Sequence, residues 1–278
     1  MVVQHNLSAM NTSRQMNSVS SAMSKSTEKL SSGYKINRAA DDAAGLSISE
    51  KMRSQIRGLN KAASNAQDGI SLVQVAEGAL NETHSILQRM NELATQAAND
   101  TNTSVDREAI QQEMNQLTSE IDRIQSTTQF NSMNLLDGTF SSKALKLQVG
   151  AMSGQSISVS IAKMSASKLG LAGTDGKVSL KVSAFSSAGA AMKTIQDAIK
   201  TVSDTRSKLG AIQNRLEHTI NNLNTTSENT QAAESRIRDT DMASEMVEYS
   251  KNNILAQAGQ SMLSQANQQT QGVLSLLQ

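Results

Sequence analysis

Residues 52–73 read MRSQIRGLNKAASNAQDGISLV, and this stretch decides the fold. Its apolar side chains recur in alternating steps of four and three residues, at Met52, Ile56, Leu59, Ala63, Ala66, Ile70 and Val73. Steps of this kind place the apolar side chains on one stripe of an α-helix. The spacing continues through Leu80 and Leu87. The sequence therefore predicts a single helix from about residue 43 to 98, on the order of 80 Å long at 1.5 Å per residue.

Helical spacing also marks most of the remaining chain. It predicts further helices around residues 16–30, 110–124, 192–223 and 242–262. In the middle, Leu145, Leu147 and Val149 alternate with polar residues, as do Ile157, Val159 and Ile161. This alternation predicts a β-hairpin over about residues 143–162. Residues 163–185 are rich in Ser, Gly and Lys, and their pattern favours neither helix nor strand.

The composition agrees with long helices. The 278 residues include no proline, no cysteine and only five aromatic residues. Proline breaks helices and aromatic side chains dominate the cores of globular domains, so this chain must bury Leu, Ile, Val, Met and Ala along extended seams. We expect a mainly α fold: a long antiparallel, coiled-coil-like helical bundle with a small β-hairpin insert and with the N- and C-terminal segments paired.

Sequence motifs of catalysis and ligand binding are missing. Without cysteine there is no disulfide, thiolate nucleophile or sulfur-bound zinc. The three histidines, His5, His84 and His218, lie in different segments, and no His-Glu-x-x-His or G-x-S-x-G motif occurs. The stretch LGLAGTDGKV at 169–178 lacks the glycine spacing and the Ser or Thr of a phosphate loop, so we interpret it as a turn. No enzymatic activity, cofactor or metal is expected.

Charge and hydropathy limit the partners. The formal net charge is +1, and the acidic and basic residues look interspersed, so nucleic acid is not expected to bind. The N-terminus has neither the basic region nor the apolar run of a cleaved signal peptide. No stretch approaches the roughly 18 continuous apolar residues of a membrane span, so no membrane insertion is expected.

Two local features leave questions for the structure. Gly58, Gly69 and Gly78 interrupt the longest helical stripe, and either close approach of a neighbouring element or simple tolerance would explain them. The adjacent acids Asp41 and Asp42 directly precede that stripe. We interpret them as the entry to the helix, where a carboxylate accepts hydrogen bonds from free backbone N–H groups, with Arg38 as a candidate ion-pair partner.

The chain resembles bacterial flagellin over nearly its whole length, apart from residues 163–185. The resemblance lies in long stretches near both ends and in the middle: NLSAMNTSRQM at 6–16, EKLSSGYKINRAADDAAGLSISEKMRSQIRGL at 28–59, TQFNSMNLLDG at 128–138, AESRIRDTDMASEM at 233–246 and QANQQTQGVLSLLQ at 265–278. It implies an extracellular structural subunit that polymerises into the helical filament used for motility. Only about twenty residues stand where larger members carry outer domains, so a short form lacking those domains is expected.

The resemblance also implies a domain division. Residues 1–42 and 235–278 would form the inner coiled-coil domain, with a spoke at 34–42 that contains Arg38, Asp41 and Asp42. Residues 43–162 and 186–234 would form the surrounding tube domain, and 163–185 the short variable segment. Polymerisation contacts are implied for apolar residues near both termini: Leu7, Met10, Val273, Leu274, Leu276 and Leu277.

Partners follow from the same resemblance. They are further copies of the chain, a flagellar export chaperone, the filament cap and the hook-junction proteins, with export through the flagellar type III system and no cleaved signal. Flagellins with a Gln-Arg-x-x-Glu-Leu-Ala motif are bound by the host's Toll-like receptor 5. The matching residues are Gln88, Arg89, Glu92 and Leu93, with Glu113 from the following helix. The same residues could instead serve subunit packing alone.

Two other structural classes stay open. A hook-filament junction protein has related terminal helices and is the nearest alternative to flagellin. A coiled-coil adaptor unconnected with flagella would share the periodicity but would not polymerise. An enzyme is disfavoured, because the metalloprotease motif found in the insert of some larger flagellins is absent.

Overall fold

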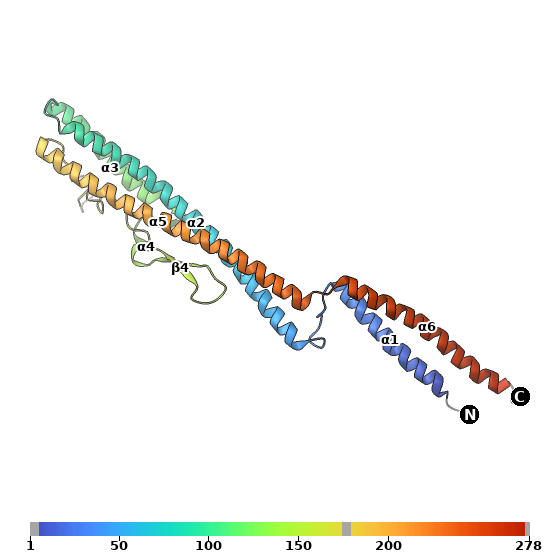
Figure 1. Cartoon of the computed structure of the whole chain (residues 1–278). Helices are drawn as coiled ribbons and strands as arrows, with labels where there is room; N and C mark the ends of the chain where they lie inside the picture. The colour runs from blue at the N-terminus through green and yellow to red at the C-terminus, as the bar shows by residue number, and fades with distance from the viewer. Residues whose placement is uncertain (1–5, 174–178, 276–278) are drawn as a thin grey trace. The chain divides into compact units, whose positions relative to one another are not determined.

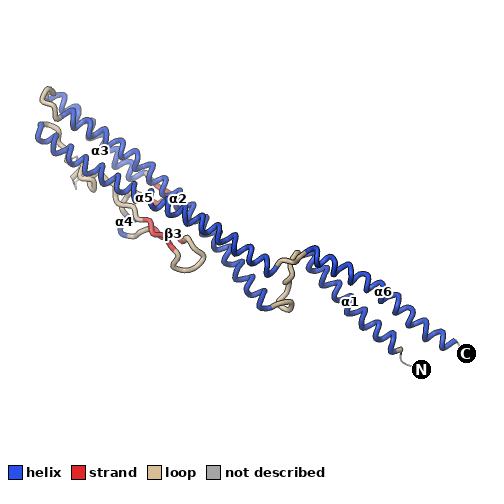
Figure 2. Tube along the Cα trace, viewed as in Figure 1, coloured by secondary structure: helices blue, strands red, loops and turns tan. Residues whose placement is uncertain are grey.

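The computed structural model describes residues 6–173 and 179–275, without the side chains of Ser142 and residues 270–275. Its helices are α1 (Leu7–Ser32), α2 (Ala43–Ala97), α3 (Ser104–Thr127), α4 (Thr139–Ser142), α5 (Phe185–Arg238) and α6 (Met242–Ser275). Its strands form two small antiparallel sheets: β1 (Gln129–Phe130) with β2 (Met133–Asn134), and β3 (Leu145–Gln148) with β4 (Ser156–Val159). Figure 2 shows how far helix dominates the described chain, which confirms the mainly α prediction.

The chain forms two compact units, and both contain segments from its two halves. The first unit comprises residues 1–56 and 228–278, and the second comprises residues 57–227. The 55 residues of α2 and the 54 of α5 each contribute to both units. Proline is absent from both helices, which lets each continue without interruption.

In the first unit, α1 and α6 lie antiparallel, with the two chain termini at the same end (Figure 1). At that end the Asn6 side-chain amide donates to the carbonyl of Ala266 at 2.9 Å. At the other end Lys29 and Glu245 form an ion pair at 3.4 Å. The termini are therefore paired, as the sequence predicted.

A short backbone link joins the ends of this helix pair. Helix α1 is capped at its C-terminal end by Gly33, whose φ of 75° is the left-handed conformation that glycine adopts without strain. Beyond it, the amide of Lys35 donates to the carbonyl of Arg238 at 2.7 Å, and the amide of Thr240 donates to the carbonyl of Gly33 at 3.0 Å. The Arg238 guanidinium lies over the Tyr34 ring, 4.6 Å from its centroid, and pairs with Glu50 at 3.1 Å. We call this cluster the 33–240 link.

The acid pair lies where the sequence placed the start of the long helix, but its two members differ. Asp42 accepts the amide of Gly45 at 2.9 Å, as an N-cap side chain does. Asp41 instead accepts the amides of Arg38 and Asn37, at 3.0 and 3.2 Å, and these bonds lower the pKa of its carboxyl. Asp41 therefore closes the turn before the helix. The ion pair of Arg38 is with Glu28 at 2.9 Å, rather than with either aspartate.

The second unit contains the hydrophobic core. The central cluster draws on α2, α3, α5, strand β4 and the segments around the strands. Its fully buried members include Leu80, Leu87, Met114 and Ile195. The α2 members continue the apolar stripe that begins at Met52. They do so because one face of the helix packs against α3 and α5 while the other faces solvent.

The predicted hairpin is present and explains two of the three helical glycines. Strand β3 pairs with β4 in the register Leu145 to Val159. A Cβ added at Gly69 would overlap the Cδ1 of Leu147 on β3, and one added at Gly58 would lie 2.9 Å from the Cβ of Ala151 in the hairpin loop. At Gly78 a Cβ would meet no atom within 4 Å. Close approach therefore accounts for Gly58 and Gly69, and simple tolerance for Gly78.

Residues 160–173 and 179–184 are the described part of what we call the connecting segment (160–184), and they pack into the core although they are in neither helix nor strand. Its described part buries Ile161, Met164, Leu169, Leu171, Leu180 and Val182. Two side chains of α3 hold its backbone. Asp122 accepts the amide of Ala166 at 2.8 Å, and Gln111 donates to the carbonyl of Leu180 at 2.9 Å while accepting the amide of Val182 at 3.0 Å. The turn expected at 169–178 falls partly on residues 174–178, outside the described residues.

Candidate functional site

The α1–α6 pair exposes many large apolar side chains and buries few residues. Among its described side chains, only Ser26, Asn252 and Ala266 are buried. Its large exposed apolar residues are Leu7, Met10, Met242, Met246, Val247, Ile254, Leu255 and Met262. On α6, Val247 and Ile254 lie seven residues apart, as do Leu255 and Met262, so these four side chains form a stripe on one face. Exposed apolar surface of this extent marks a site of protein association.

The terminal residues with implied polymerisation contacts are distributed unevenly in the described chain. Leu7 is 65% exposed and Met10 is 57% exposed, and both lie in the first turn of α1. Val273 and Leu274 belong to the last turns of α6, where the structure describes the backbone alone. Leu276 and Leu277 lie outside the described residues. The structure thus places Leu7 and Met10 on the free surface of the helix pair.

The residues with an implied receptor role come from two helices. Arg89 on α2 donates through Nε and Nη2 to one carboxylate oxygen of Glu113 on α3, at 3.1 and 3.0 Å, and through Nη1 to Glu92 at 3.2 Å. The hydrogen bond to Glu113, followed by that to Glu92, raises the pKa of Arg89. Gln88 lies beside them, with its amide nitrogen 3.0 Å from the Nε2 of His84. These exposed groups form one polar patch, which we call the Arg89 patch.

Leu93 does not belong to the accessible surface. Only 2% of this residue is exposed, and it is part of the central core cluster with residues of α3, α5 and the connecting segment. The motif spacing alone could not reveal this, because the connecting segment that completes the cluster has no periodicity. In this conformation the side chain contributes to folding, and the Arg89 patch presents only polar groups to a partner.

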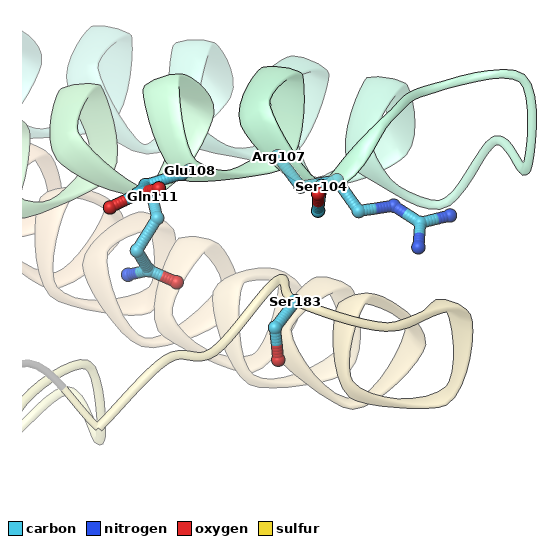
Figure 3. Close-up of a pocket in the computed structure, with 5 residues that line it drawn as sticks. All are labelled: Ser104, Arg107, Glu108, Gln111 and Ser183. Atoms are coloured by element: carbon cyan, nitrogen blue, oxygen red, sulfur yellow. The ribbon is translucent and has the colours of Figure 1, made fainter.

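A hollow of about 300 Å³ lies between the start of α3 and the end of the connecting segment, lined by Ser104, Arg107, Glu108, Gln111 and Ser183 (Figure 3). Arg107 is already bound to the carbonyls of Ala97 and Asn99 and to Asp100. Gln111 is occupied by the backbone of the connecting segment. The hollow therefore offers no set of free groups that converge on a ligand.

Other kinds of site find no support in the described part of the chain. No three His, Asp or Glu side chains in it are arranged to hold a metal ion. None of its helices is both long and apolar enough to cross a membrane. The most prominent feature of the described surface is thus the exposed apolar face of α1 and α6.

Comparison with known proteins identifies the family. The model of the bacterial flagellin N-terminal helical region matches residues 3–141, and that of the C-terminal helical region matches residues 192–277. The chain belongs to the bacterial flagellin family. It is 56% identical to a flagellin of Halalkalibacterium halodurans and 53% identical to a flagellin of Bacillus subtilis, each match covering all of both chains. A flagellar filament core protein of Treponema maltophilum is 49% identical, also over the whole of both chains.

Two solved structures share the architecture. The crystal structure of Bacillus cereus flagellin, 32% identical, covers 62% of this chain and 94% of its own, with a TM-score of 0.50. A putative flagellar hook-associated protein from Vibrio parahaemolyticus covers 72% of this chain and 100% of its own, with a TM-score of 0.59 and 16% identity. The second likeness concerns the fold alone. Both solved structures therefore share the fold of this chain. The long sequence matches assign the chain to the flagellins.

Proposed function

We propose that this protein is a structural, non-enzymatic subunit of the bacterial flagellar filament. The observation that carries the proposal is the α1–α6 pair, with three buried side chains and eight large exposed apolar ones among the described residues. Ordering a helix costs conformational entropy, which burial of apolar surface must offset. Further copies of the chain would supply that burial. Full-length similarity to named flagellins and filament core proteins supports the same role.

The domain roles and further partners extend this proposal. Residues 1–42 and 235–278 would form the inner layer of the filament, with the spoke at 34–42, and residues 43–162 and 186–234 the surrounding tube. The 163–185 segment would stand in place of the outer domains. Since the filament lies outside the cell, the chain would be exported by the flagellar type III system, held by a chaperone, and would meet cap and hook-junction proteins.

Polymerisation seeded with sheared filament fragments tests the role. Wild-type monomer should extend the seeds in electron micrographs, whereas Ile254→Ser should raise the critical monomer concentration by about ten- to a hundredfold. This range corresponds to the roughly 1.5–3 kcal/mol gained by fully burying an aliphatic side chain, at about 1.4 kcal/mol per tenfold. Because Ile254 is 65% exposed in the subunit, monomer stability should change little.

Ile48→Ser provides the matched control. Ile48 is 46% exposed but lies on α2, outside the α1–α6 pair. This variant should polymerise like the wild type. Failure of wild-type monomer to extend the seeds would remove the filament role and favour an adaptor that does not polymerise. Recovery of the protein only as a minor component at the base of sheared filaments would favour the hook-filament junction alternative.

We also propose that the Arg89 patch is recognised by the host's Toll-like receptor 5. Its support is that Gln88, Arg89, Glu92 and Glu113 are exposed on adjacent helices, and that hydrogen bonds fix Arg89 and Glu113 relative to each other. A guanidinium held in this way is organised before a partner arrives, which reduces the entropy lost on binding. Leu93 is left out of this proposal because of its burial.

Monomeric Arg89→Ala tests the receptor proposal. Loss of a pre-organised, charged interface residue should weaken receptor binding by about tenfold or more, while the free energy of unfolding stays within about 0.5 kcal/mol. Arg123→Ala is the control, since Arg123 forms a similar exposed ion pair with Glu120 on α3. Equal binding of both variants and the wild type, measured by surface plasmon resonance, would contradict this role for the patch.

A further inference from the structure

The charges of the second unit are divided between its two sequence halves. Residues 57–138 carry eleven acidic and five basic residues, whereas residues 139–227 carry eleven basic and four acidic residues. The formal charges of these halves are thus −6 and +7, counting histidine as neutral. The near-neutral total had suggested interspersed charges. The division shows instead that one half of this unit is an anion and the other a cation.

The structure keeps most of the basic charge free. Eight lysines of the second half are exposed: Lys143, Lys146, Lys163, Lys168, Lys181, Lys193, Lys200 and Lys208. None of the eight forms an ion pair among the described residues, and the single described ion pair between the two halves joins Arg206 to Glu77 at 3.7 Å. Lys193 and Lys200 lie seven residues apart on α5, with Lys208 a further eight along, so they follow one stripe of the helix. The exposed Asp197 and Asp204 fall between them on the same stripe, so the basic excess of the half comes mainly from its other lysines.

The acidic half also presents free carboxylates. Asp68 and Glu82 on α2 and Glu108 on α3 are exposed and form no ion pair within the described chain. Asp68 and Glu82 are fourteen residues apart and therefore share one face of α2. In Figure 1 the hairpin extends from one side of the long helices. Lys146 lies on its strand β3, and Lys163, Lys168 and Lys181 belong to the connecting segment that follows it.

We propose that the basic half of this unit docks on the acidic half of the next copy of the chain. The inference rests on the proposed function and specifies the chemistry of one subunit contact. A head-to-tail contact joins two different surfaces, one from each of two copies. A subunit with one acidic and one basic surface is therefore complementary to a second copy of itself. A surface adapted to an external polyanion would need the lysines but not a matching excess of carboxylates. The near-equality of the two charges therefore favours a second copy as the occupant.

Charge reversal tests this contact in seeded polymerisation of the full chain. The basic-side variant carries Lys193→Glu, Lys200→Glu and Lys208→Glu, and the acidic-side variant carries Asp68→Lys, Glu82→Lys and Glu108→Lys. At roughly 50 mM salt each variant alone should show a critical concentration raised on the order of tenfold or more, because like charges now meet. At roughly 500 mM salt the difference in critical concentration from the wild type should shrink, because the Debye length is then only about 4 Å and the charges are screened beyond it.

The decisive arm mixes the two variants. In an alternating copolymer every contact again joins opposite charges, so the equimolar mixture should polymerise at close to the wild-type concentration. A control with Lys193→Arg, Lys200→Arg and Lys208→Arg keeps the charge and should behave as wild type. Circular dichroism of each monomer checks that the helices are intact.

Each result separates the contact from the filament role. If the wild type extends seeds and both reversal variants do so equally well at low salt, the charge contact is wrong and the filament role stands. If both variants are impaired but their mixture gains nothing, the two halves do not meet each other and the proposal fails. Binding of heparin by the wild type, lost in the basic-side variant while its assembly is unchanged, would assign the lysines to a polyanion instead. Failure of the wild type itself would remove the filament role.

Discussion

Replacing Leu93 by alanine is expected to destabilise the monomer by about 2–5 kcal/mol, the usual cost of deleting a buried leucine side chain. Leu93 is 2% exposed, and its neighbours in the core come from α2, α3, α5 and the connecting segment. These elements are tied into one cluster and cannot collapse freely into the cavity, so the cost should lie well above that of a surface change. Denaturant unfolding of the monomer, monitored by circular dichroism, measures it.

Val75→Ala is the control for this change. Val75 is on the same helix but 40% exposed, and its replacement should alter the free energy of unfolding by no more than about 0.5 kcal/mol. Equal stability of Leu93→Ala and the wild type would show that Leu93 is not buried in the core. The side chain would then be available to a receptor. Any loss of receptor binding by Leu93→Ala must therefore be judged against its folded fraction.

Gly69→Ala and Gly78→Ala should change stability in opposite directions, although both replace a glycine inside α2. At Gly78 the new methyl group meets no atom within 4 Å, so alanine should stabilise the monomer by about 0.5–1 kcal/mol through helix propensity. At Gly69 the methyl group overlaps Leu147, which packs against two core clusters and has little room to move. We expect a net destabilisation of about 1–2 kcal/mol there.

A second substitution identifies the cause of the Gly69 effect. If overlap with Leu147 is responsible, the penalty of Gly69→Ala should shrink when Leu147 is also changed to alanine, which a double-mutant cycle would measure as coupling. Amide hydrogen exchange of β3 and β4 should be faster in Gly69→Ala and unaffected in Gly78→Ala. Stabilisation of the monomer by both glycine replacements would mean that the hairpin does not approach α2 closely.

Periodicity predicted the long elements well, for a physical reason. A helix that buries one face for 55 residues must repeat its apolar positions many times, so the signal from α2 accumulates. The hairpin was predicted equally well, because each strand alternates apolar and polar residues between a buried and an exposed face. The pairing of α1 and α6 followed from the resemblance and from the need to bury stripes on both flanks.

The connecting segment was not predictable, because its burial has no period. Residues such as Met164, Leu171 and Val182 are buried one at a time, and side chains of α3 rather than a regular ladder satisfy some of their backbone groups. Gln111 and Asp122 look like ordinary polar surface positions in the sequence. The burial of Leu93 was missed with them, since the motif identified the residue but not its surroundings. The small β1–β2 sheet and α4 were also too short to leave a pattern.

Of the interactions outside the core, likewise, some could be predicted from the sequence and others could not. Local interactions, such as the contact of Asp42 with the start of α2, could be proposed from adjacent residues. The alternatives for the glycines could be separated only after the hairpin was placed beside α2. Arg38 shows the limit of local reasoning, since its ion-pair partner Glu28 lies ten residues away on α1 rather than beside it.

The 33–240 link also has a bearing on the order in which the chain folds. It joins residues about 200 positions apart, and the contact of Asn6 with Ala266 spans 260 positions. Contacts across such separations carry a large loop-closure cost unless the intervening chain has already become compact. We therefore expect the core of residues 57–227 to form first and to bring residues 33 and 240 together before α1 pairs with α6. On this expectation the helices at the two ends of the chain are the last to gain a partner, and the first to lose one when the core is weakened.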